Sequence, residues 1–550
     1  MGFNLGVLND ALGAAIPDRI AIVHGERRVS YRELAAESRQ LAAALAARGY
    51  GAHRERSELS GHESGQDHLA LYLLNGVEYL TGMLGAFKAR VAPLNVNYRY
   101  VADELRYLLR DSGARAVMYH DRFASTLAEV LPDLDTVELL VQVPDETDAD
   151  LLPGAIRYAT LLAEAAPDAL ATQPSPDDLY ILYTGGTTGM PKGVLWRQHD
   201  IFVSAMGGRP FGAAEAFGSL EEVTDAAVNG GMAMLTAAPL MHGAAQWLAF
   251  ICFTGGGTLI LAPDPTRFDA AQILEATVRE RVGTLQVVGD AMARPIVEEL
   301  ERGTYDLSGL FALGNGGAAL SPGLKERFLE AVPHALIVDA VGSSETGAQM
   351  GHTSMKGAAS TGTFTPGPDT VVVSADLDRF LDSDDDEVGW LAQRGHVPLG
   401  YLGDRDKTAA TFPVIDGVRV SVPGDRARWV ADGVVELLGR DSMTINSGGE
   451  KVFVEEVEQA ILHHPSVVDV MVVGRPDDRW GEVVVALVQL APGASADVDD
   501  ILAVAAERVA RYKLPREVVI KEALVRSPAG KADYRWARAE AERSSERSPG

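Results

Sequence analysis

The chain has 550 residues, more than one hydrophobic core ordinarily organises, so two or more domains are expected. Lys and Arg number 49 against 77 Asp and Glu, and the net charge of -28 argues against nucleic acid or an anionic membrane surface as the main partner. The single cysteine, Cys252, cannot form an internal disulfide, and Met1–Ala11 lacks the layout of a signal peptide. A cytoplasmic protein is therefore expected, with Cys252 as a buried, inert thiol.

The N-terminal part alternates helix and strand patterns. Ser30 and Glu33 form a capping box, and leucines on one face then continue a helix as far as Gly49. Further helices are predicted at 75–89 and 101–110, and strands at 69–73, 91–95 and 116–119. Such alternation is typical of parallel sheets with helices on both faces, so the fold class is α/β.

Three irregular stretches interrupt this pattern. Gly51–His68 is polar and holds three histidines, but it has no thiol partners, so a solvated loop is favoured over a metal site. The acidic run Asp382–Glu387 is interpreted as a solvated turn between short strands. Gln246–Ala262 is the longest apolar stretch; three consecutive glycines break it, so it is predicted to form core strands rather than cross a membrane.

The last hundred or so residues are predicted to form a separate small α/β unit. A strand at 434–438 ends at Gly439–Arg440, which places the domains at 1–438 and 439–550. The large domain would hold parallel sheets with flanking helices and a small β-rich part. In the small domain we predict helices at 454–462 and 498–511, strands at 467–473, 482–490 and near 518, and a frayed tail from Ser544.

An apolar strand beginning at Tyr180 leads directly into a loop rich in glycine and threonine. Glycines let backbone amides turn toward an anion, threonine hydroxyls add donors, and a lysine adds charge, so this is a phosphate cradle. Its candidate residues are Thr184, Gly185, Gly186, Thr187, Thr188 and Lys192. Met190 and Pro191 separate the last glycine from the lysine, which excludes a Walker A loop.

A second glycine-rich segment invites a different interpretation. Gly314, Gly316 and Ala319 fit the G-x-G-x-x-A pattern of a dinucleotide site, but only one strand–helix–strand unit carries it. The neighbouring Ser344–Glu345 pair follows a strand, and a hydroxyl beside a carboxylate can hold a phosphate oxygen and Mg²⁺ together.

These segments together resemble the adenylate-forming superfamily of acyl-CoA synthetases, luciferases and peptide-synthetase adenylation domains. The resemblance spans nearly the whole chain, with motifs in the family's order: 184–193 (TGGTTGMPKG), 316–320 (GGAAL), 343–347 (SSETG), 423–425 (PGD), 439–440 (GR), 447–451 (SGGEK) and 527–531 (SPAGK). Stretches at 194–202, 289–295 and 527–536 are most similar to actinobacterial synthetases for lipid or sterol side-chain acids.

The resemblance implies a two-step reaction with ATP, Mg²⁺ and CoA. A carboxylic acid would become an acyl-adenylate and then a thioester. It implies that Lys531 serves adenylation, Ser344 and Glu345 act at the phosphates and metal, and Asp425 and Arg440 contact the ribose. It also implies an adenine-side loop at Gly316, Gly317 and Ala318, and a substrate and CoA channel that includes His242, Gly316, Gly342, Gly448 and Gly449.

Several assignments stay open at this point. Asp339 either receives the adenine amine or is a buried structural carboxylate, and His242 either lines the acyl entrance or is a satisfied core histidine. The alternative interpretation of Lys531 is an ordinary exposed surface lysine. Val341 stands where relatives carry an adenine-stacking tyrosine, and Ser442 occupies the hinge position.

Rival functions also stay open. The acyl group could pass to a carrier protein instead of CoA, or enter a luciferase-like oxidation. A non-catalytic alternative is a protein that binds a nucleotide without turning it over. Small-molecule acid, ATP and CoA are the expected partners, without an integral membrane segment, and a homodimer is not excluded.

Overall fold

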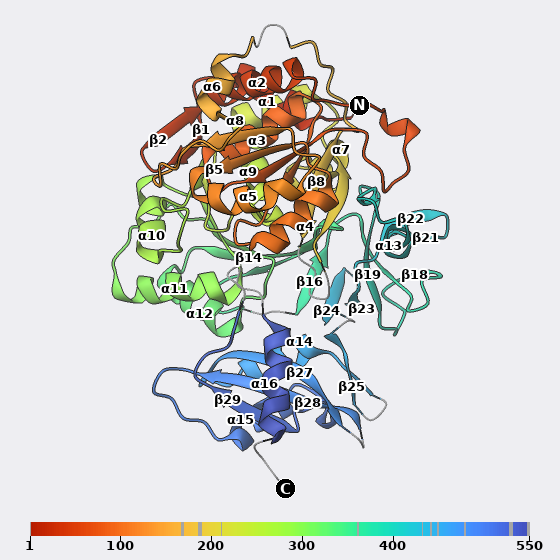
Figure 1. Ribbon diagram of the computed structural model, residues 1–550. Helices are drawn as coiled ribbons and strands as arrows, with labels where there is room; N and C mark the ends of the chain where they lie inside the picture. The colour runs from red at the N-terminus through yellow and green to blue at the C-terminus, as the bar shows by residue number, and fades with distance from the viewer. Residues whose placement is uncertain are drawn as a thin grey trace.

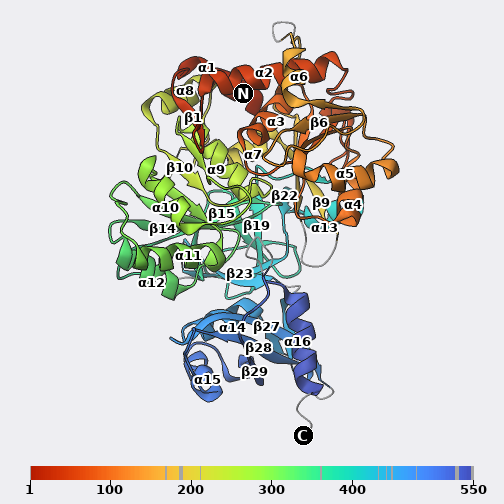
Figure 2. The same ribbon diagram turned by 60° about the vertical axis from the view of Figure 1, so that its left-hand side comes forward.

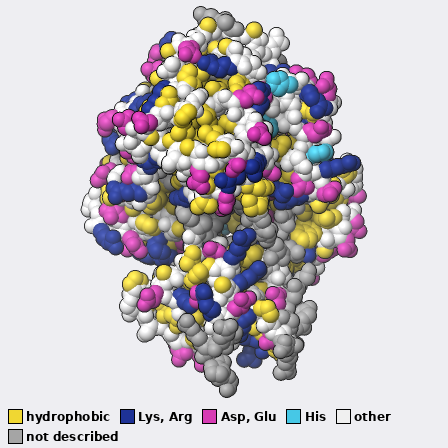
Figure 3. Space-filling view, in the orientation of Figure 1, with side chains coloured by type: hydrophobic (Ala, Val, Ile, Leu, Met, Phe, Trp, Pro, Cys, Tyr) yellow, Lys and Arg dark blue, Asp and Glu magenta, His cyan; other side chains and the backbone are white. Residues whose placement is uncertain are grey.

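The computed structural model describes residues 2–166, 170–184, 190–210, 212–359, 362–431, 433–440, 443–447, 450–477, 480–526 and 532–546. A larger N-terminal part contains two sheets, and a smaller C-terminal part contains a third (Figure 1). The two parts meet at a narrowed waist, which the space-filling view also shows (Figure 3). The α/β fold class is confirmed.

The first sheet has eight strands in the order β20-β9-β8-β4-β3-β5-β6-β7, and its strands from β8 to β7 run parallel. Its strands are β3 (His68–Tyr72), β4 (Ala92–Asn95), β5 (Ala116–His120), β6 (Leu139–Val143), β7 (Ala155–Arg157), β8 (Leu179–Thr184), β9 (Lys192–Arg197) and β20 (Gly400–Tyr401). Its associated helices are α2 (Tyr31–Ala47), α3 (Val77–Lys88), α4 (Ala102–Ser112), α5 (Ala124–Val130) and α6 (Tyr158–Ala163). The predicted capping box of α2 is confirmed: Ser30 and Glu33 exchange hydrogen bonds.

The second sheet combines a parallel half with an antiparallel half. The parallel half contains β1 (Ile20–His24), β10 (Met234–Thr236), β11 (Leu259–Leu261), β12 (Thr284–Val287), β13 (Ala312–Gly316) and β14 (Leu336–Ser343). The antiparallel part contains β2 (Arg27–Ser30), β15 (Gly347–Ser354), β16 (Thr363–Pro366), β17 (Thr370–Val373), β18 (Phe380–Leu381), β19 (Gly389–Arg394), β21 (Val414–Ile415), β22 (Val418–Ser421), β23 (Asp425–Ala431) and β24 (Val434–Arg440).

Helices cover this second sheet on the side of the first sheet and at its outer edge (Figures 1 and 2). They are α1 (Leu5–Ala15), α7 (Gln198–Ala205), α8 (Leu220–Asn229), α9 (Gly243–Thr254), α10 (Ala270–Arg279), α11 (Gly289–Arg302) and α12 (Pro322–Ala331), whereas α13 (Arg405–Thr411) packs against β20 of the first sheet. Because β10, β12, β13 and β14 are parallel, their carboxyl ends meet at one edge, where open α/β sheets bind ligands.

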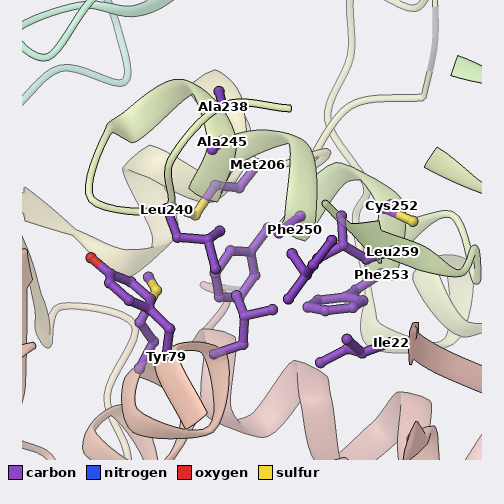
Figure 4. Packing of buried hydrophobic residues seen from close by; sticks show 14 of the residues in the cluster. Ile22, Tyr79, Met206, Ala238, Leu240, Ala245, Phe250, Cys252, Phe253 and Leu259 are labelled. Carbon is purple, nitrogen blue, oxygen red and sulfur yellow. The ribbon is translucent and has the colours of Figure 1, made fainter. Parts of the chain in front are cut away.

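The prediction of strands across Gln246–Ala262 was wrong in its first half. Residues up to Thr254 form the helix α9, and only Leu259–Leu261 form a strand. The helix packs Phe250 and Phe253 into the core beside Leu259 and Ile22 (Figure 4), so it is apolar on nearly every side and shows no helical periodicity. Cys252 on this helix is fully buried, and burial raises the pKa of its thiol to about 12.

The C-terminal part has a five-stranded sheet flanked by three helices (Figure 2). Its strands are β25 (Ile445–Ser447), β26 (Glu450–Val452), β27 (Val467–Asp477), β28 (Gly481–Leu490) and β29 (Glu517–Lys521), and its helices are α14 (Val454–Leu462), α15 (Val498–Ala506) and α16 (Tyr534–Glu546). Two predicted bounds were wrong: α15 ends at Ala506, and α16 continues through Ser544 because Ala537 and Ala541 pack on the sheet.

Of the other two irregular stretches, the loop predicted at Gly51–His68 ends one residue early, and the acidic turn lies where it was predicted. Residues 51–67 contain a single short 3₁₀ turn, while His68 belongs to β3 and is buried. The acidic run Asp382–Glu387 connects β18 to β19. Within the described part of the chain, none of the helices combines the length and the apolar character needed to cross a membrane.

Candidate active site

One cavity of about 1690 Å³ lies at the carboxyl ends of the parallel strands. Its walls come from the ends of β12, β13 and β14, from α9, and from the C-terminal part. Several residues predicted from the motifs line it: Thr184, His242, Gly316, Gly317, Ala318, Gly342, Ser344, Glu345 and Arg440. The fold thus brings motifs from distant parts of the sequence into one space.

The loop between β14 and β15 holds Ser344 and Glu345, and buried contacts fix its backbone. Trp196 Nε1 donates to the Ser344 carbonyl at 2.8 Å, and Ser421 Oγ donates to the Glu345 carbonyl at 2.6 Å. Gly347 closes the loop with φ +70°, and a Cβ there would lie 2.1 Å from Ser204 Oγ. Glycine is therefore required at 347 for the loop to keep this shape.

The carboxylate of Glu345 is held by a residue of the first sheet. Tyr401 Oη donates to Glu345 Oε1 at 2.8 Å, and burial together with this carboxylate raises the tyrosine pKa. Among the described residues no donor reaches the other oxygen, Oε2. An oriented carboxylate with one uncommitted oxygen is a ligand type that Mg²⁺ accepts, so the residues present fit a magnesium ion shared with phosphate oxygens.

The loop predicted to lie beside adenine follows β13 and is anchored by Asn315. Asn315 Nδ2 donates to the Ala318 carbonyl at 3.1 Å and to Asp339 Oδ1 at 2.9 Å. Gly317 has φ +84°, which a side chain would strain. Asp339 itself pairs with the fully buried Lys325 at 2.6 Å and is outside the cavity lining, so the structure favours its buried structural interpretation.

Thr184 and Lys192 face each other across the β8–β9 pair, at the two ends of the predicted phosphate loop. Lys192 Nζ lies 2.5 Å from Asp404 Oδ2. This hydrogen bond raises the pKa of the lysine and lowers that of the aspartate, so both are charged at neutral pH. Lys192 is not part of the cavity lining; an anion there would have to draw it from Asp404.

Asp425 and Arg440 pair at the beginning and end of the β23–β24 hairpin, with Arg440 Nε 3.2 Å from Asp425 Oδ1. Burial raises the pKa of Asp425, while the guanidinium opposes that shift. Arg440 lines the cavity and Asp425 lies behind it. Arg440, the last residue of β24, therefore places a positive charge at the cavity wall.

The C-terminal part closes one side of the cavity. Arg526 and Ala532, which flank residues 527–531 in the sequence, both line it, and so do Glu455, Glu458 and Tyr534. Arg294 of α11 donates to the carbonyl of Val468 at 2.6 Å and ties the two parts together beside this wall.

An apolar arm of the same cavity runs between α9 and the face of the second sheet. Trp247 and Ile251 contribute one wall, and alternate residues of the strands contribute the other: Ala312 and Gly314 on β13, Leu336 and Val338 on β14. Along α9 this arm extends for about 18 Å, given the rise per residue of an α-helix. Because glycine and alanine have small side chains, the strand face does not narrow this arm of the cavity.

Other predicted residues cannot be placed in the same way. Those outside the described residues are Gly185, Gly186, Thr187, Thr188, Ser442, Gly448, Gly449 and Lys531. His242 caps α9 at the cavity wall, and Val341 lines the cavity half-buried. The sequence motifs do not include Tyr401, Asp404 and Glu455. These residues contact Glu345, Lys192 and Arg440 respectively, and each is distant in sequence from its partner, so no local pattern marks them.

Comparison with known families agrees with this geometry. The family described as AMP-binding enzyme matches residues 11–402, and the family described as AMP-binding enzyme C-terminal domain matches residues 456–531. The chain belongs to the AMP-binding enzyme family. The resemblance to the adenylate-forming superfamily is thereby confirmed.

Curated relatives cover nearly the whole chain. A medium-chain acyl-CoA ligase of Mycobacterium avium is 53% identical over 540 residues, 98% of each chain. A 3-oxocholest-4-en-26-oate–CoA ligase of Rhodococcus rhodochrous is 39% identical over 551 residues, 98% of this chain and 96% of the relative. The solved anthranilate CoA ligase AuaEII with anthranoyl-AMP is 22% identical, covers 99% of this chain and 98% of its own, and superposes with a TM-score of 0.80, which shows the shared fold.

Proposed function

We propose that this protein is an ATP-dependent, AMP-forming acyl-CoA synthetase for a hydrophobic carboxylic acid. The observation that carries the proposal is the continuity of one cavity: its apolar arm along α9 meets the Ser344–Glu345 loop and Arg440 at the carboxyl ends of the strands. An apolar acid lying in the arm would present its carboxylate where phosphate-binding groups converge. The relatives named as acyl-CoA ligases support the same reaction.

In the first half-reaction the acid's carboxylate oxygen attacks the α-phosphorus of ATP, and pyrophosphate leaves with the electron pair of the broken P–O bond. Positioning and charge stabilisation dominate such a transfer. Thr184 and Lys192 would hold the outer phosphates, Arg440 and Asp425 the ribose, and Lys531 the developing charge at the α-phosphate. Glu345 and phosphate oxygens would hold Mg²⁺, which when bound supplies positive charge against the phosphates.

In the second half-reaction the thiolate of CoA attacks the acyl carbon and AMP leaves, so the thioester replaces the mixed anhydride. We propose that the part from residue 439 onward rotates as a unit between the steps and then presents Gly448 and Gly449 to the pantetheine arm. The present orientation, with Arg526 and Ala532 at the cavity, suits the first step. Fatty acids and sterol side-chain acids are the proposed substrates, because the arm is apolar and wide.

The test is a product analysis with a panel of medium-chain, long-chain, aromatic and sterol side-chain acids, each with ATP and Mg²⁺. Pyrophosphate, AMP and thioester are quantified with CoA, without CoA, and with a phosphopantetheinylated carrier protein in its place. Equal amounts of AMP, pyrophosphate and acyl-CoA support the proposal. Thioester formed on the carrier but not on CoA would assign the alternative, and no pyrophosphate with any acid would favour binding without turnover.

A further inference from the structure

Two carboxyl groups of the C-terminal part, Glu455 and Glu458, line the cavity. They lie nearly one turn apart on α14. Glu458 belongs to its own part of the fold: Tyr534 Oη donates to its two oxygens at 3.0 and 3.1 Å, and the Val472 N–H donates to it at 2.8 Å. Glu455 instead reaches across to the larger part.

The carboxyl group of Glu455 lies directly against Gly439. A Cβ at position 439 would be 2.0 Å from Glu455 Oε2 and would displace that side chain, and Gly439 has φ +110°, which a side chain would strain. The backbone N–H of Arg440 donates a long hydrogen bond of 3.4 Å to Oε1. Oε2 is buried, and no donor among the described residues reaches it. The side chain of Glu455 thus fills the seam between α14 and β24.

The charges around this seam disfavour a second negative charge. Asp425 and Arg440 face Glu455 from β23 and β24, and Glu458 faces it from α14; Arg526, Asp469 and Tyr534 lie beyond Glu458. Burial raises the pKa of Glu455 from 4.5 to about 7 and that of Glu458 to about 8. A buried carboxylate with an unsatisfied oxygen is costly, whereas its neutral acid is much less so.

We propose that Glu455 is a positioning residue: as a neutral carboxylic acid it seats the C-terminal part against Gly439 in the orientation that serves the first half-reaction. The proposal rests on the proposed function, because it assigns this orientation to adenylation. Seating takes up one proton, and unseating returns it to solvent as the carboxylate becomes hydrated. The hydrogen-bond partners of Glu458, Tyr534 and Val472, belong to the C-terminal part and would move with it.

The direction of the pH dependence follows from these values. Once exposed, Glu455 regains its ordinary pKa of 4.5, and in the seam its pKa is about 7. The seated orientation is therefore favoured fully below 4.5, and this preference is lost progressively as pH rises through 7. Adenylation should fall relative to thioester formation over that window, by about tenfold or more.

The test compares Glu455→Gln with wild type and with the matched control Glu456→Gln. Glutamine has the shape of the neutral acid but cannot ionise, and Glu456, the next residue on α14, pairs with Lys513 away from the seam. Two rates are measured from about pH 5 to 8: ATP–pyrophosphate exchange that requires the carboxylic acid substrate, and acyl-CoA formation from supplied acyl-adenylate. In the ratio of the two rates, the effects of any ionisation that changes both rates equally cancel.

In wild type and Glu456→Gln the ratio of pyrophosphate exchange to acyl-CoA formation should fall as pH rises. In Glu455→Gln this ratio should stay constant, and near the highest pH measured its exchange rate should exceed that of wild type. The same falling ratio in Glu455→Gln would overturn the proposal. Should Glu455→Gln lower the melting temperature, Glu455→Met, which also cannot ionise, makes the same comparison. Absence of pyrophosphate exchange in the wild-type enzyme at every pH would contradict the proposed function instead, so the two failures are distinguishable.

Discussion

The hydroxyl of Tyr401 donates a hydrogen bond of 2.8 Å to Oε1 of Glu345 and so joins strand β20 of the first sheet to the β14–β15 loop of the second. The bond orients a carboxylate that faces the cavity, and it leaves the other oxygen for a ligand. A carboxylate that is already oriented loses less conformational freedom when a metal or phosphate arrives. Tyr401 therefore supports the site without reaching the reacting atoms.

Replacing Tyr401 by phenylalanine removes this bond but keeps the ring packed near Phe412. We expect acid-dependent pyrophosphate exchange to fall about tenfold, the scale of one hydrogen bond to a charged group, with little change in melting temperature. The measurement is pyrophosphate exchange across a magnesium titration. Unchanged exchange would show that Glu345 holds its position without Tyr401.

Glu345→Gln should raise the magnesium concentration needed for half-maximal adenylation, because an amide is a poorer ligand for this hard cation than a carboxylate. The protein should remain folded, since the loop is fixed through backbone carbonyls by Trp196 and Ser421. A magnesium titration that coincides with the wild-type curve would place the metal on other groups.

Gly314 lies on the wall of the apolar arm, and a Cβ added there meets Thr284 Cγ2 at 3.7 Å and Leu285 O at 3.9 Å, which is ordinary contact. Gly314→Val should thus fold and narrow the arm. Activity toward bulky or long acids should fall about tenfold or more, while short acids are retained. Gly309→Val is the matched control, because Gly309 is exposed and outside the cavity. Equal losses for all acids would argue against an acyl group in this arm.

Lys531→Ala tests the residue that the SPAGK motif assigns to adenylation. We expect acid-dependent pyrophosphate exchange to fall about 10²-fold or more, the scale for removing one charge-stabilising donor. Conversion of supplied acyl-adenylate to acyl-CoA should be largely spared, because the C-terminal part would turn this lysine away for the second step. Equal loss in both assays would remove the role given to Lys531.

The turn that carries Ser344 and Glu345 is marked in the sequence because its pattern is local. Ser344 and Glu345 are adjacent, and the glycine at 347 is needed by the same turn that presents them, so one short segment carries both the shape and the groups. Contacts between segments could not be predicted in this way. Tyr401 lies 56 residues from Glu345 and Asp404 lies 212 residues from Lys192, so only the folded sheets bring them together.

The parallel sheets were predictable from helix–strand alternation, whereas α9 was not. Its residues 246–253 are almost entirely apolar because one side meets the core and the other the cavity, so neither helical nor strand periodicity is visible. The three glycines after it end the helix instead of separating two strands. The end of α15 is not marked in the sequence either, because the residues past Ala506 form turns but do not differ from a helix in composition.

The central claim is that the acid's own oxygen forms a bond to the α-phosphorus of ATP, and isotope transfer measures it directly. An acid carrying ¹⁸O in both carboxylate oxygens is converted with ATP and CoA, and the masses of AMP and acyl-CoA are determined. The account predicts that one labelled oxygen appears in AMP and the other remains in the thioester carbonyl. Unlabelled AMP, or label recovered in inorganic phosphate together with ADP, would contradict it.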